Sequence, residues 1–570
     1  MTGHGEGAED ESGRGQRHAY GRGYGHGRGP AAGPRWWHDA VVYQVYPRSF
    51  LDTDGDGVGD LPGVSRRIPH LASLGVDALW LSPFFSSPMA DFGYDIRDHT
   101  AVDPLFGRLS DFDALLATAH SHGLRVLIDY VPNHTSSEHP WFRESRSAPP
   151  GGRRRDWYVW RDPAPGGGPP NNWITLFGES AWTLDEDSGQ FYLHSFLPSM
   201  PDLDWRNPEV KEAMFDVARF WLDRGVDGFR VDCAPLVAKD PALRDNPPAP
   251  VGAVAHHRPM GGYDSQLHLH DQGHPDLHTV YREFRTLLDG YGDGPAERIC
   301  LGEVHAYDWK VWSSYFGQGL DEIHLPINFG LLQTPWEPEA IEGLVREVVD
   351  ALPAGAVPTW VAGSHDDPRV ASRVGADQAP NAMLLLLTLP GAAILYNGDE
   401  LGLPDAHIGP ADIRDPWGLR TPGLSRDPAR SPMPWNAGPH AGFTAPGVRP
   451  WLPLALPPGG DAAAQEDDPG SLLRLTRAVL ALRREHPALG PGAIGFTAAP
   501  PGVLAYTRTG PDGAGPLLVT LNLTAAPVRL TGASAAPSWR RRLTTAPVPR
   551  PPADARVLSP HEGAIWTRHP

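Results

Sequence analysis

Short apolar segments alternate along most of the chain with longer segments in which apolar side chains recur every third or fourth position. The short segments are typical of strands buried on both faces, and the longer ones of amphipathic helices. Eight strands that alternate with helices indicate an α/β fold, the (β/α)8 or TIM barrel. The expected strands are residues 40–50, 77–84, 125–132, a short segment directly after Gly225, 299–304, 322–328, 358–364 and 392–396.

The helical spacing carries end signals as well. Ser110 and Ser471 are expected to cap the helices that they begin, which are followed by Gly123 and Pro487 respectively. Gly225 follows the end of a third helix. The expected helices are residues 64–74, 110–122, 210–224, 277–288, 338–352, 378–389 and 471–485.

The pattern also divides the chain. Residues 1–34 form a Gly-, His- and Arg-rich tail without an apolar segment, which predicts disorder. We expect the barrel to comprise 35–132 and 205–490, interrupted after the third strand by an inserted subdomain, 133–204, whose many aromatic residues need a core. Alternating segments then predict a C-terminal all-β domain, a β-sandwich, over 491–570.

Charge and composition narrow the class of protein. The formal net charge of −19 argues against nucleic acid or an anionic membrane as a partner. No apolar run reaches the ~18 residues of a candidate membrane span. The two cysteines, Cys233 and Cys300, lie in apolar strand-like segments, which favours free buried thiols. Without a secretory signal at the start of the sequence, we expect a cytoplasmic protein.

Acidic residues stand at or near the ends of three expected barrel strands: Asp232 after the fourth, Glu303 after the fifth and Asp366 after the seventh. Strand ends at the C-terminal face of such a barrel carry the chemistry. Arg230 lies two residues before Asp232 and so shares its face, which predicts an ionised nucleophile. Carboxylates and apolar neighbours are expected to raise the pKa of Glu303, the acid/base. This pairing fits glycosidic bond cleavage, with a surface ion pair as the alternative reading of Arg230 and Asp232.

A second acidic motif follows the first strand. Carboxylates at alternate positions, separated by glycines, suit a Ca²⁺ loop, but Gly63 stands where an EF-hand has its bidentate Glu. An acidic turn without metal is the alternative. The expected ligands are Asp52, Asp54, Asp56, Val58 (through its carbonyl) and Asp60. Structural Ca²⁺ is the one cofactor that we expect, with no organic cofactor.

Four sequence blocks resemble those of the α-amylase family of glycoside hydrolases (family 13), and a fifth, 200–204, resembles its oligo-1,6-glucosidase and neopullulanase branches. The resemblance extends from about Trp36 to the C-terminus. It implies a retaining mechanism on α-linked glucosyl substrates, with Asp232 as nucleophile, Glu303 as acid/base and Asp366 as the third acid. The four blocks are Asp129–His134, Gly228–Asp232, Leu301–Glu303 and Ser364–Asp366.

Residues 170–178 and 426–435 are similar to the α-glucosidase/oligo-1,6-glucosidase group. The resemblance implies that Asp95 and Arg430 pair around the non-reducing end, making a pocket for exo-action on short oligosaccharides or disaccharides. The other sugar contacts that it implies are Tyr94, His134, Phe177, Arg230 and His365. Ser364 and Met200 depart from the usual Asn and Gln, which loosens the substrate assignment.

Three functions stay open on this scaffold. The first is an exo-acting α-glucosidase that releases terminal glucose from maltose-like oligosaccharides. The second is a glucosyl transferase or isomerase, forming trehalose or isomaltulose, or an oligo-1,6-glucosidase. The third, a non-catalytic transporter subunit, fits poorly because all three acids are present. The resemblance also implies a linkage preference: α-1,6-specific members tend to carry Val directly after the nucleophile and α-1,4-specific ones a smaller residue, so Cys233 favours α-1,4 linkages. The sequence leaves the oligomeric state open.

Overall fold

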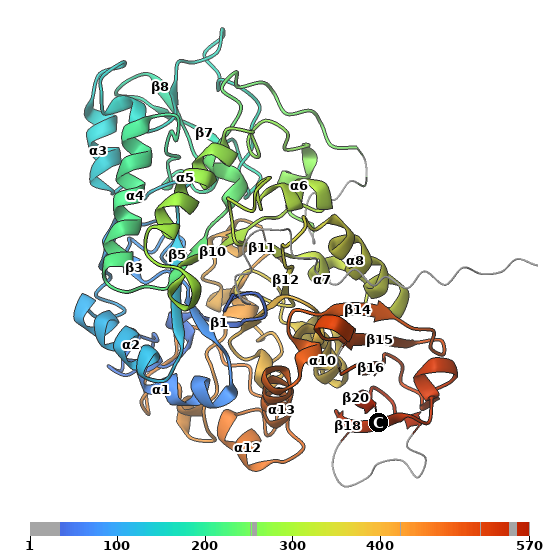
Figure 1. Cartoon of the computed structure of the whole chain (residues 1–570). Coiled ribbons are helices and arrows are strands. Elements are labelled where there is room, and N and C mark those ends of the chain that lie inside the picture. Colours follow the sequence, from blue (N-terminus) through green and yellow to red (C-terminus); the bar gives the residue numbers. More distant parts are fainter. Residues whose placement is uncertain are drawn as a thin grey trace, which may run out of the picture.

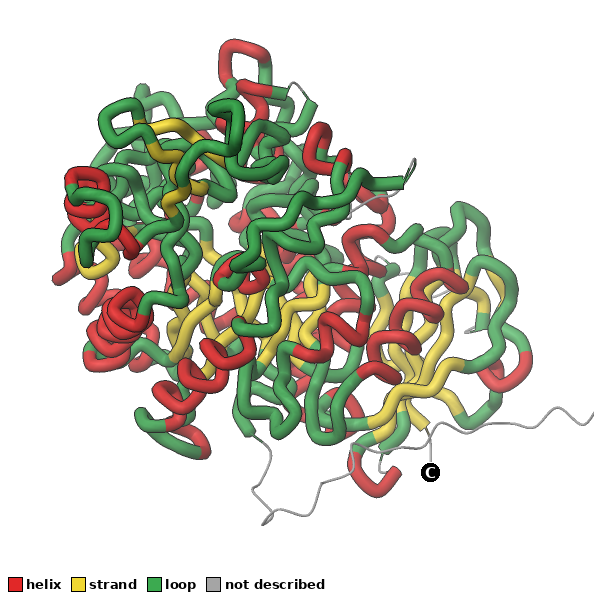
Figure 2. Tube along the Cα trace, turned by 90° about the horizontal axis from the view of Figure 1, so that it is seen from above, coloured by secondary structure: helices red, strands yellow, loops and turns green. Residues whose placement is uncertain are grey.

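A computed structural model describes residues 35–568, except 251, 253–258, 422, 514 and 547–555. The predicted disordered tail, residues 1–34, lies outside the described residues. Eight parallel strands form a closed barrel in the order β1-β13-β12-β11-β10-β9-β5-β2 (Figures 1 and 2). They are β1 (Val41–Val45), β2 (Ala78–Leu81), β5 (Arg125–Tyr130), β9 (Gly228–Val231), β10 (Ile299–Glu303), β11 (Leu325–Asn328), β12 (Thr359–Val361) and β13 (Ala392–Tyr396).

The register of these strands sets the layout of the barrel mouth. Arg230 on β9 lies opposite Asp129 on β5 and Leu301 on β10. Gly228 begins β9 with φ +153°, and a Cβ at this position would lie 2.1 Å from the carbonyl oxygen of Ile299. Glycine is therefore required where β9 enters between its neighbours.

Helices cover the outside of the barrel. Ser471 caps α13 as expected, because its side chain accepts from the N–H of Arg474. The expected cap at Ser110 is wrong: the helix begins at Leu109, and the N–H of Arg108 donates to Asp111. The principal helices are α1 (Leu61–Leu74), α2 (Leu109–Ser121), α4 (Pro208–Asp223), α5 (Leu277–Asp289), α6 (Trp309–Ser314), α8 (Pro338–Ala351), α10 (Ala379–Thr388) and α13 (Leu472–Glu485).

Between β5 and β9 the chain leaves the barrel and forms α3 (Pro140–Ser147) and a small antiparallel sheet of β6 (Trp160–Arg161), β8 (Gln190–Leu193) and β7 (Trp182–Asp185). Trp173, Trp182 and Phe191 belong to a core of its own. This inserted subdomain lies beside the C-terminal end of the barrel, where it can form one wall of an active site (Figure 1).

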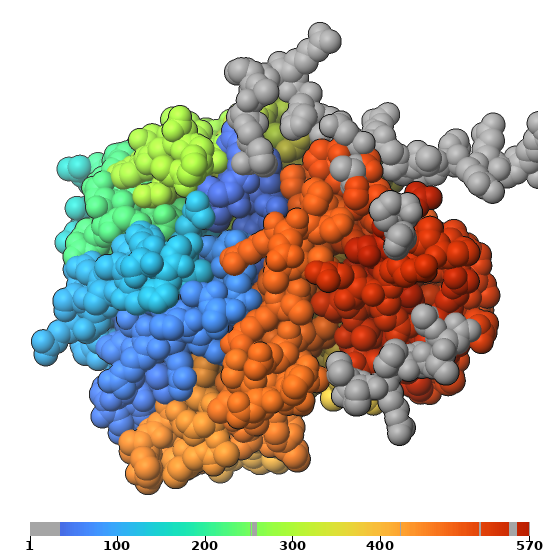
Figure 3. Space-filling view, turned by 60° about the horizontal axis from the view of Figure 1, so that its bottom comes forward, coloured from blue at the N-terminus to red at the C-terminus, as the bar shows by residue number. Residues whose placement is uncertain are grey.

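The C-terminal segment forms a five-stranded antiparallel sheet, β14 (Ala493–Phe496), β15 (Val503–Thr509), β16 (Leu517–Asn522), β20 (Gly563–Arg568) and β18 (Trp539–Thr544). A two-stranded sheet, β17 (Val528–Arg529) with β19 (Val557–Leu558), accompanies it. Figure 3 shows this part as a red lobe at one side of the molecule. Asn381 of α10 donates to the carbonyl of Asn522, which ties the lobe to the barrel. The predicted TIM barrel with a C-terminal all-β domain is thus confirmed. Within the described residues, no helix has both the length and the apolar character to cross a membrane.

Candidate active site

A cavity with about 1120 Å³ of empty space, part of it open to the solvent, lies at the C-terminal end of the barrel. Residues at the strand ends and in the inserted subdomain after β5 contribute to its walls. Its lining includes all three predicted catalytic acids, Asp232, Glu303 and Asp366, together with Tyr94 and His134. Eight strands thus bring acids that are far apart in the sequence into one site.

Arg230 organises the acids at the floor of this cavity. Its Nη1 lies 2.5 Å from Oδ1 of Asp232, as the shared strand face predicts, and 2.9 Å from Oδ1 of Asp129. Its Nη2 lies 2.8 Å from Oε2 of Glu303. One carboxylate oxygen of Asp232 and one of Glu303 lie within 4.8 Å of each other. A single buried guanidinium therefore bridges both members of the predicted catalytic pair.

The directions of the pKa shifts in this pair differ from the expectation. Burial raises the pKa of Asp232 well above its usual range, and the neighbouring Glu303 carboxylate adds to that rise although Arg230 opposes it. Burial also disfavours the Glu303 carboxylate, but Arg230 and His305 outweigh it and lower the pKa of Glu303 to about 2. The sequence placed Arg230 beside Asp232 alone, whereas the structure also places it against Glu303, and this second contact lowers the pKa of Glu303.

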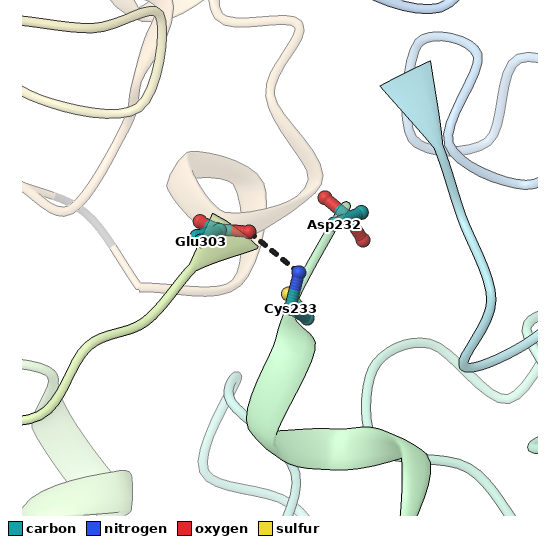
Figure 4. A group of neighbouring side chains, drawn as sticks. All are labelled: Asp232, Cys233 and Glu303. Carbon is teal, nitrogen blue, oxygen red and sulfur yellow. Dashed lines mark hydrogen bonds between the residues drawn. The ribbon is translucent and has the colours of Figure 1, made fainter. Parts of the chain in front are cut away.

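Glu303 is held from three directions. Besides Arg230, the backbone N–H of Cys233 donates to Oε2 over 2.7 Å (Figure 4), and Nε2 of His305 lies 3.1 Å from Oε1. Cys233 adopts φ +42°, a left-handed conformation uncommon for a residue other than glycine. The turn after β9 thereby directs the N–H of Cys233 toward Glu303 at the end of β10. Cys233 itself lines the cavity as a free thiol.

Asp366 follows β12 and stays charged. Its Oδ1 accepts from Nη2 of Arg430 over 2.7 Å and from Nη1 of Arg426 over 3.2 Å. Burial opposes ionisation, but the adjacent His365 and these arginines hold the pKa of Asp366 well below its usual range. Ser364, which departs from the family pattern, accepts the N–H of Asp366 and so supports the same turn.

The expected pairing of Asp95 with Arg430 is wrong. Asp95 is fully buried and accepts from the Ser87 hydroxyl and from the N–H groups of Ala90 and Asp91. The acid that faces an arginine is Asp91, whose Oδ1 accepts from Nη2 of Arg426 over 2.6 Å. Asp91 and Arg426 both line the cavity, whereas Asp95 and Arg430 support it from behind.

The remaining predicted sugar contacts divide into two groups. Tyr94 and His134 line the cavity, and burial lowers the pKa of His134 to about 4, so its imidazole is neutral. His365 stacks on Tyr94 at 5.6 Å and hydrogen-bonds its hydroxyl over 2.7 Å, so it lies behind that ring. Phe177 does not reach the cavity: it packs edge-on against Trp417, and its neighbour Leu176 lines the wall instead.

Sequence reasoning missed Asp91, Arg426 and His305. Asp91 and Arg426 lie in the same short motifs as Asp95 and Arg430, but spacing alone does not tell which acid of the first motif and which arginine of the second face the cavity. His305 follows Glu303 by two residues on a strand end, and that spacing predicts a shared face.

The predicted metal loop lies beside β1, away from the acids. Asp52, Asp54 and Asp60 place carboxylate oxygens within 4.8 Å of one another. Asp56 is not in this cluster, and its Oδ1 accepts the N–H of Val58. Asp60 also caps α1 by accepting from Gly63. Three of the expected ligands are therefore gathered, and the donor set of carboxylate oxygens suits a hard cation.

The fold and the paired acids define a TIM-barrel enzyme of the kind that cleaves glycosidic bonds. The family model described as the alpha amylase catalytic domain matches residues 44–492. The chain belongs to the α-amylase family of glycoside hydrolases.

Individual relatives support this membership. The chain is 43% identical over 490 residues to a probable alpha-glucosidase of Rhizobium meliloti, covering 83% of this chain and 87% of that relative. It is 41% identical over 424 residues to an alpha-glucosidase of Culex pipiens, covering 73% and 70%. The solved structure of the alpha-glucosyl transfer enzyme XgtA matches with a TM-score of 0.87 at 41% identity, covering 94% of this chain and all (100%) of that one. Trehalulose synthase MutB from Pseudomonas mesoacidophila matches with a TM-score of 0.82 at 30% identity, covering 94% and 100%.

Proposed function

We propose that the protein is a retaining, exo-acting α-glucosidase that releases terminal glucose from maltose-like saccharides. One observation carries this: Asp232 and Glu303 lie within 4.8 Å of each other, in a cavity where Asp91 and Arg426 meet in an ion pair. Carboxyl groups roughly 5 Å apart fit double displacement, since inverting enzymes need room for a water molecule between them. The ion pair would close the pocket around a single terminal sugar.

In the proposed reaction Asp232 attacks C1 of the glucosyl unit while Glu303 gives its proton to the glycosidic oxygen, and the C1–O bond breaks. Glu303 then takes a proton from water. The water oxygen bonds to C1 and the ester bond to Asp232 breaks, so C1 recovers its original configuration. Asp366 is placed to stabilise the positive charge that develops on the ring.

The pKa directions of Asp232 and Glu303 do not conflict with these roles. Cleavage needs one carboxylate and one carboxylic acid, so we propose that the two acids share a single proton, which lies on Glu303 when the substrate is bound. Because Arg230 contacts both acids, it can stabilise either distribution of charge.

Asp232→Asn and Glu303→Gln test the assignment. Each variant should lower kcat for maltose by more than about 10³-fold, because each removes a group that acts only on the reacting bond. NMR of the fresh wild-type reaction should show the α-anomer of glucose first. Either variant within tenfold of wild type, or a β-anomer as first product, would refute the proposal.

A second candidate is glucosyl transfer, and the apolar part of the cavity lining favours it. Leu176, Phe196, Leu236 and Met260 line the cavity, and apolar walls hold water poorly. The solved structure at a TM-score of 0.87 is also described as an alpha-glucosyl transfer enzyme. Product analysis on maltose, isomaltose, sucrose and trehalose separates the two functions: free glucose in excess over transfer products supports hydrolysis.

We further propose that the loop of Asp52, Asp54 and Asp60 holds structural Ca²⁺. These carboxylates repel one another without a cation. Asp60 caps α1 and Asp52 accepts from Gly55 and Gly57, so a bound ion would tie the loop to the first helix. The ion would lie at β1 and take no part in the bond cleavage.

We also propose that the protein works in the cytoplasm. Cys233 and Cys300 are both free thiols, which is usual in a reducing compartment. Cell fractionation checks this, and recovery of the protein outside the cytoplasm would overturn it.

A further inference from the structure

The three groups that contact Glu303 differ in what else they can do. The N–H of Cys233 and Nη2 of Arg230 both approach Oε2, at 2.7 and 2.8 Å. Nε2 of His305 lies 3.1 Å from Oε1. All three suit a carboxylate, yet the proposed reaction also requires Glu303 as a carboxylic acid.

A backbone N–H and a guanidinium can only donate hydrogen bonds. An imidazole donates from one ring nitrogen and accepts at the other, and the two tautomers exchange these roles. When Glu303 carries a proton on Oε1, an imidazole protonated at Nδ1 can accept that O–H at Nε2. Oε2 still accepts from Cys233 and Arg230 when Oε1 carries the proton, so of these three contacts only the one with His305 has to reverse its direction.

The ring of His305 is also fixed in place. It stacks on Phe329, which follows β11, with ring centroids 4.0 Å apart and an angle of 22° between the planes. His305 leaves β10 two residues after Glu303 and lines the cavity. Stacking sets the ring plane, so that Nε2 can face Glu303 without a search among rotamers.

Other charges around Glu303 do not offer this exchange. Arg230 is always protonated, and Asp366 and Asp129 act on Glu303 only through space. The groups that face Glu303 are Arg230, Asp232 and Cys233 from β9 and its following turn, Asp129 from β5, His305 from β10 and Asp366 from the turn after β12.

We propose that His305 is a positioning residue for the acid/base step, which hydrogen-bonds Glu303 in both its carboxylate and its carboxylic acid form. It donates from Nε2 when Glu303 has lost its proton to the leaving group. When Glu303 has regained a proton from water, Nε2 accepts from it; for this the imidazole gives its Nε2 proton to water in the cavity and takes up another from water at Nδ1. This role rests on the proposed glycosidase function and adds to it a residue that keeps the acid in register with the glycosidic oxygen through the cycle.

His305→Phe is the main test, because a phenyl ring keeps the stacking on Phe329 and loses the hydrogen bond. Protonation of the leaving group by a general acid is important when a sugar departs, and much less important when 4-nitrophenolate departs. For maltose, kcat/KM should therefore fall by about 100-fold, and for 4-nitrophenyl α-glucoside by less than about threefold. The basic limb of the kcat/KM profile should move to higher pH, because the charge-assisted bond that His305 donates to the carboxylate is stronger than the bond it accepts from the acid, so its loss raises the pKa of Glu303.

His305→Gln is the rescue variant, since an amide both donates and accepts hydrogen bonds. Its kcat/KM for maltose should be at least about tenfold higher than that of His305→Phe. His278→Phe is the matched control. His278 makes a similar contact, 2.7 Å to the carboxylate of Glu322, outside the cavity, and its loss should leave the ratio of the two substrates unchanged.

Equal losses on both substrates, or a basic limb that does not move, would overturn the positioning role, as would an unchanged maltose activity in His305→Phe. If the wild type itself cleaves neither substrate, the proposed function fails instead. Melting temperatures of all three variants separate misfolding from either result, and the His305→Gln data decide if His305→Phe does not fold.

Discussion

The guanidinium of Arg426 donates to the carboxylate of Asp91 over 2.6 Å, joining the segment after β2 to the long segment after β13. The same guanidinium donates to Asp415 and lies 3.2 Å from Asp366. The pair is thus anchored behind the cavity and presented at its wall. We expect both side chains to bind hydroxyls of the terminal glucose.

Asp91→Asn and Arg426→Lys should each lower kcat/KM for maltose by about 100-fold, since each removes a charge-assisted hydrogen bond that a lysine or an amide does not replace. Steady-state kinetics on maltose measure this.

Asp95→Asn is the comparison. The Asp95 carboxylate accepts hydrogen bonds from Ser87, Ala90 and Asp91. The change should therefore lower the free energy of unfolding by about 1–3 kcal/mol, seen as a lower melting temperature, and should reduce kcat/KM by less than tenfold. If Asp95→Asn impairs catalysis more than Asp91→Asn, the assignment of the glucose-binding acid reverts to Asp95.

These two acids show where sequence reasoning reached its limit. Barrel strands were predictable because apolar segments and helix ends are local signals, and Arg230 with Asp232 followed from strand periodicity. Which of Asp91 and Asp95 faces the cavity depends on a turn whose backbone N–H groups Asp95 itself binds. The contact of Arg230 with Glu303 depends on the pairing of β9 with β10. Neither the orientation of the two acids nor the contact of Arg230 with Glu303 can be predicted from the spacing of residues within one segment.

Glu400 gives a pH dependence of stability. It follows β13, accepts from the Tyr43 hydroxyl over 2.8 Å and from the N–H of Gly398, and burial raises its pKa from 4.5 to about 7. The folded state therefore favours the protonated form. The contribution of Glu400 to the free energy of unfolding is fully present below about pH 4.5 and is lost as the pH rises through about 7. Its size is on the order of 3 kcal/mol.

Glu400→Gln should keep this stability at high pH, because the amide stays neutral. Melting temperatures between pH 5 and 8 should decline less in the variant than in the wild type. Glu339→Gln, on the exposed surface of α8, is the control and should follow the wild type. Parallel declines in all three proteins would show that Glu400 does not carry the effect.

Calcium should stabilise the fold without taking part in the reaction. A chelator is expected to lower the melting temperature, and added Ca²⁺ to restore it, because the carboxylates of Asp52, Asp54 and Asp60 are then left to repel one another. Asp54→Asn should reduce the response to chelator. An unchanged melting temperature, with no metal by elemental analysis, would leave the acidic turn as the better description.

The last prediction concerns linkage preference and depends on Cys233. This residue lines the cavity directly after the nucleophile, and its N–H holds Glu303, so its side chain borders the place of the departing sugar. A small side chain leaves room for an α-1,4-linked sugar, and we expect a higher kcat/KM for maltose than for isomaltose. Cys233→Val should shift that ratio toward isomaltose by about tenfold, since one methyl group in such a pocket is worth about 1–3 kcal/mol.

The ratio is the right measurement because valine also disfavours the left-handed backbone at φ +42°, which lowers activity on both substrates alike. Cys233→Ser keeps the size of the side chain and should leave the ratio near that of the wild type. If the wild type already prefers isomaltose, the size of Cys233 does not set the linkage preference. The residue would then matter only through its backbone N–H, which positions Glu303 in every one of these variants.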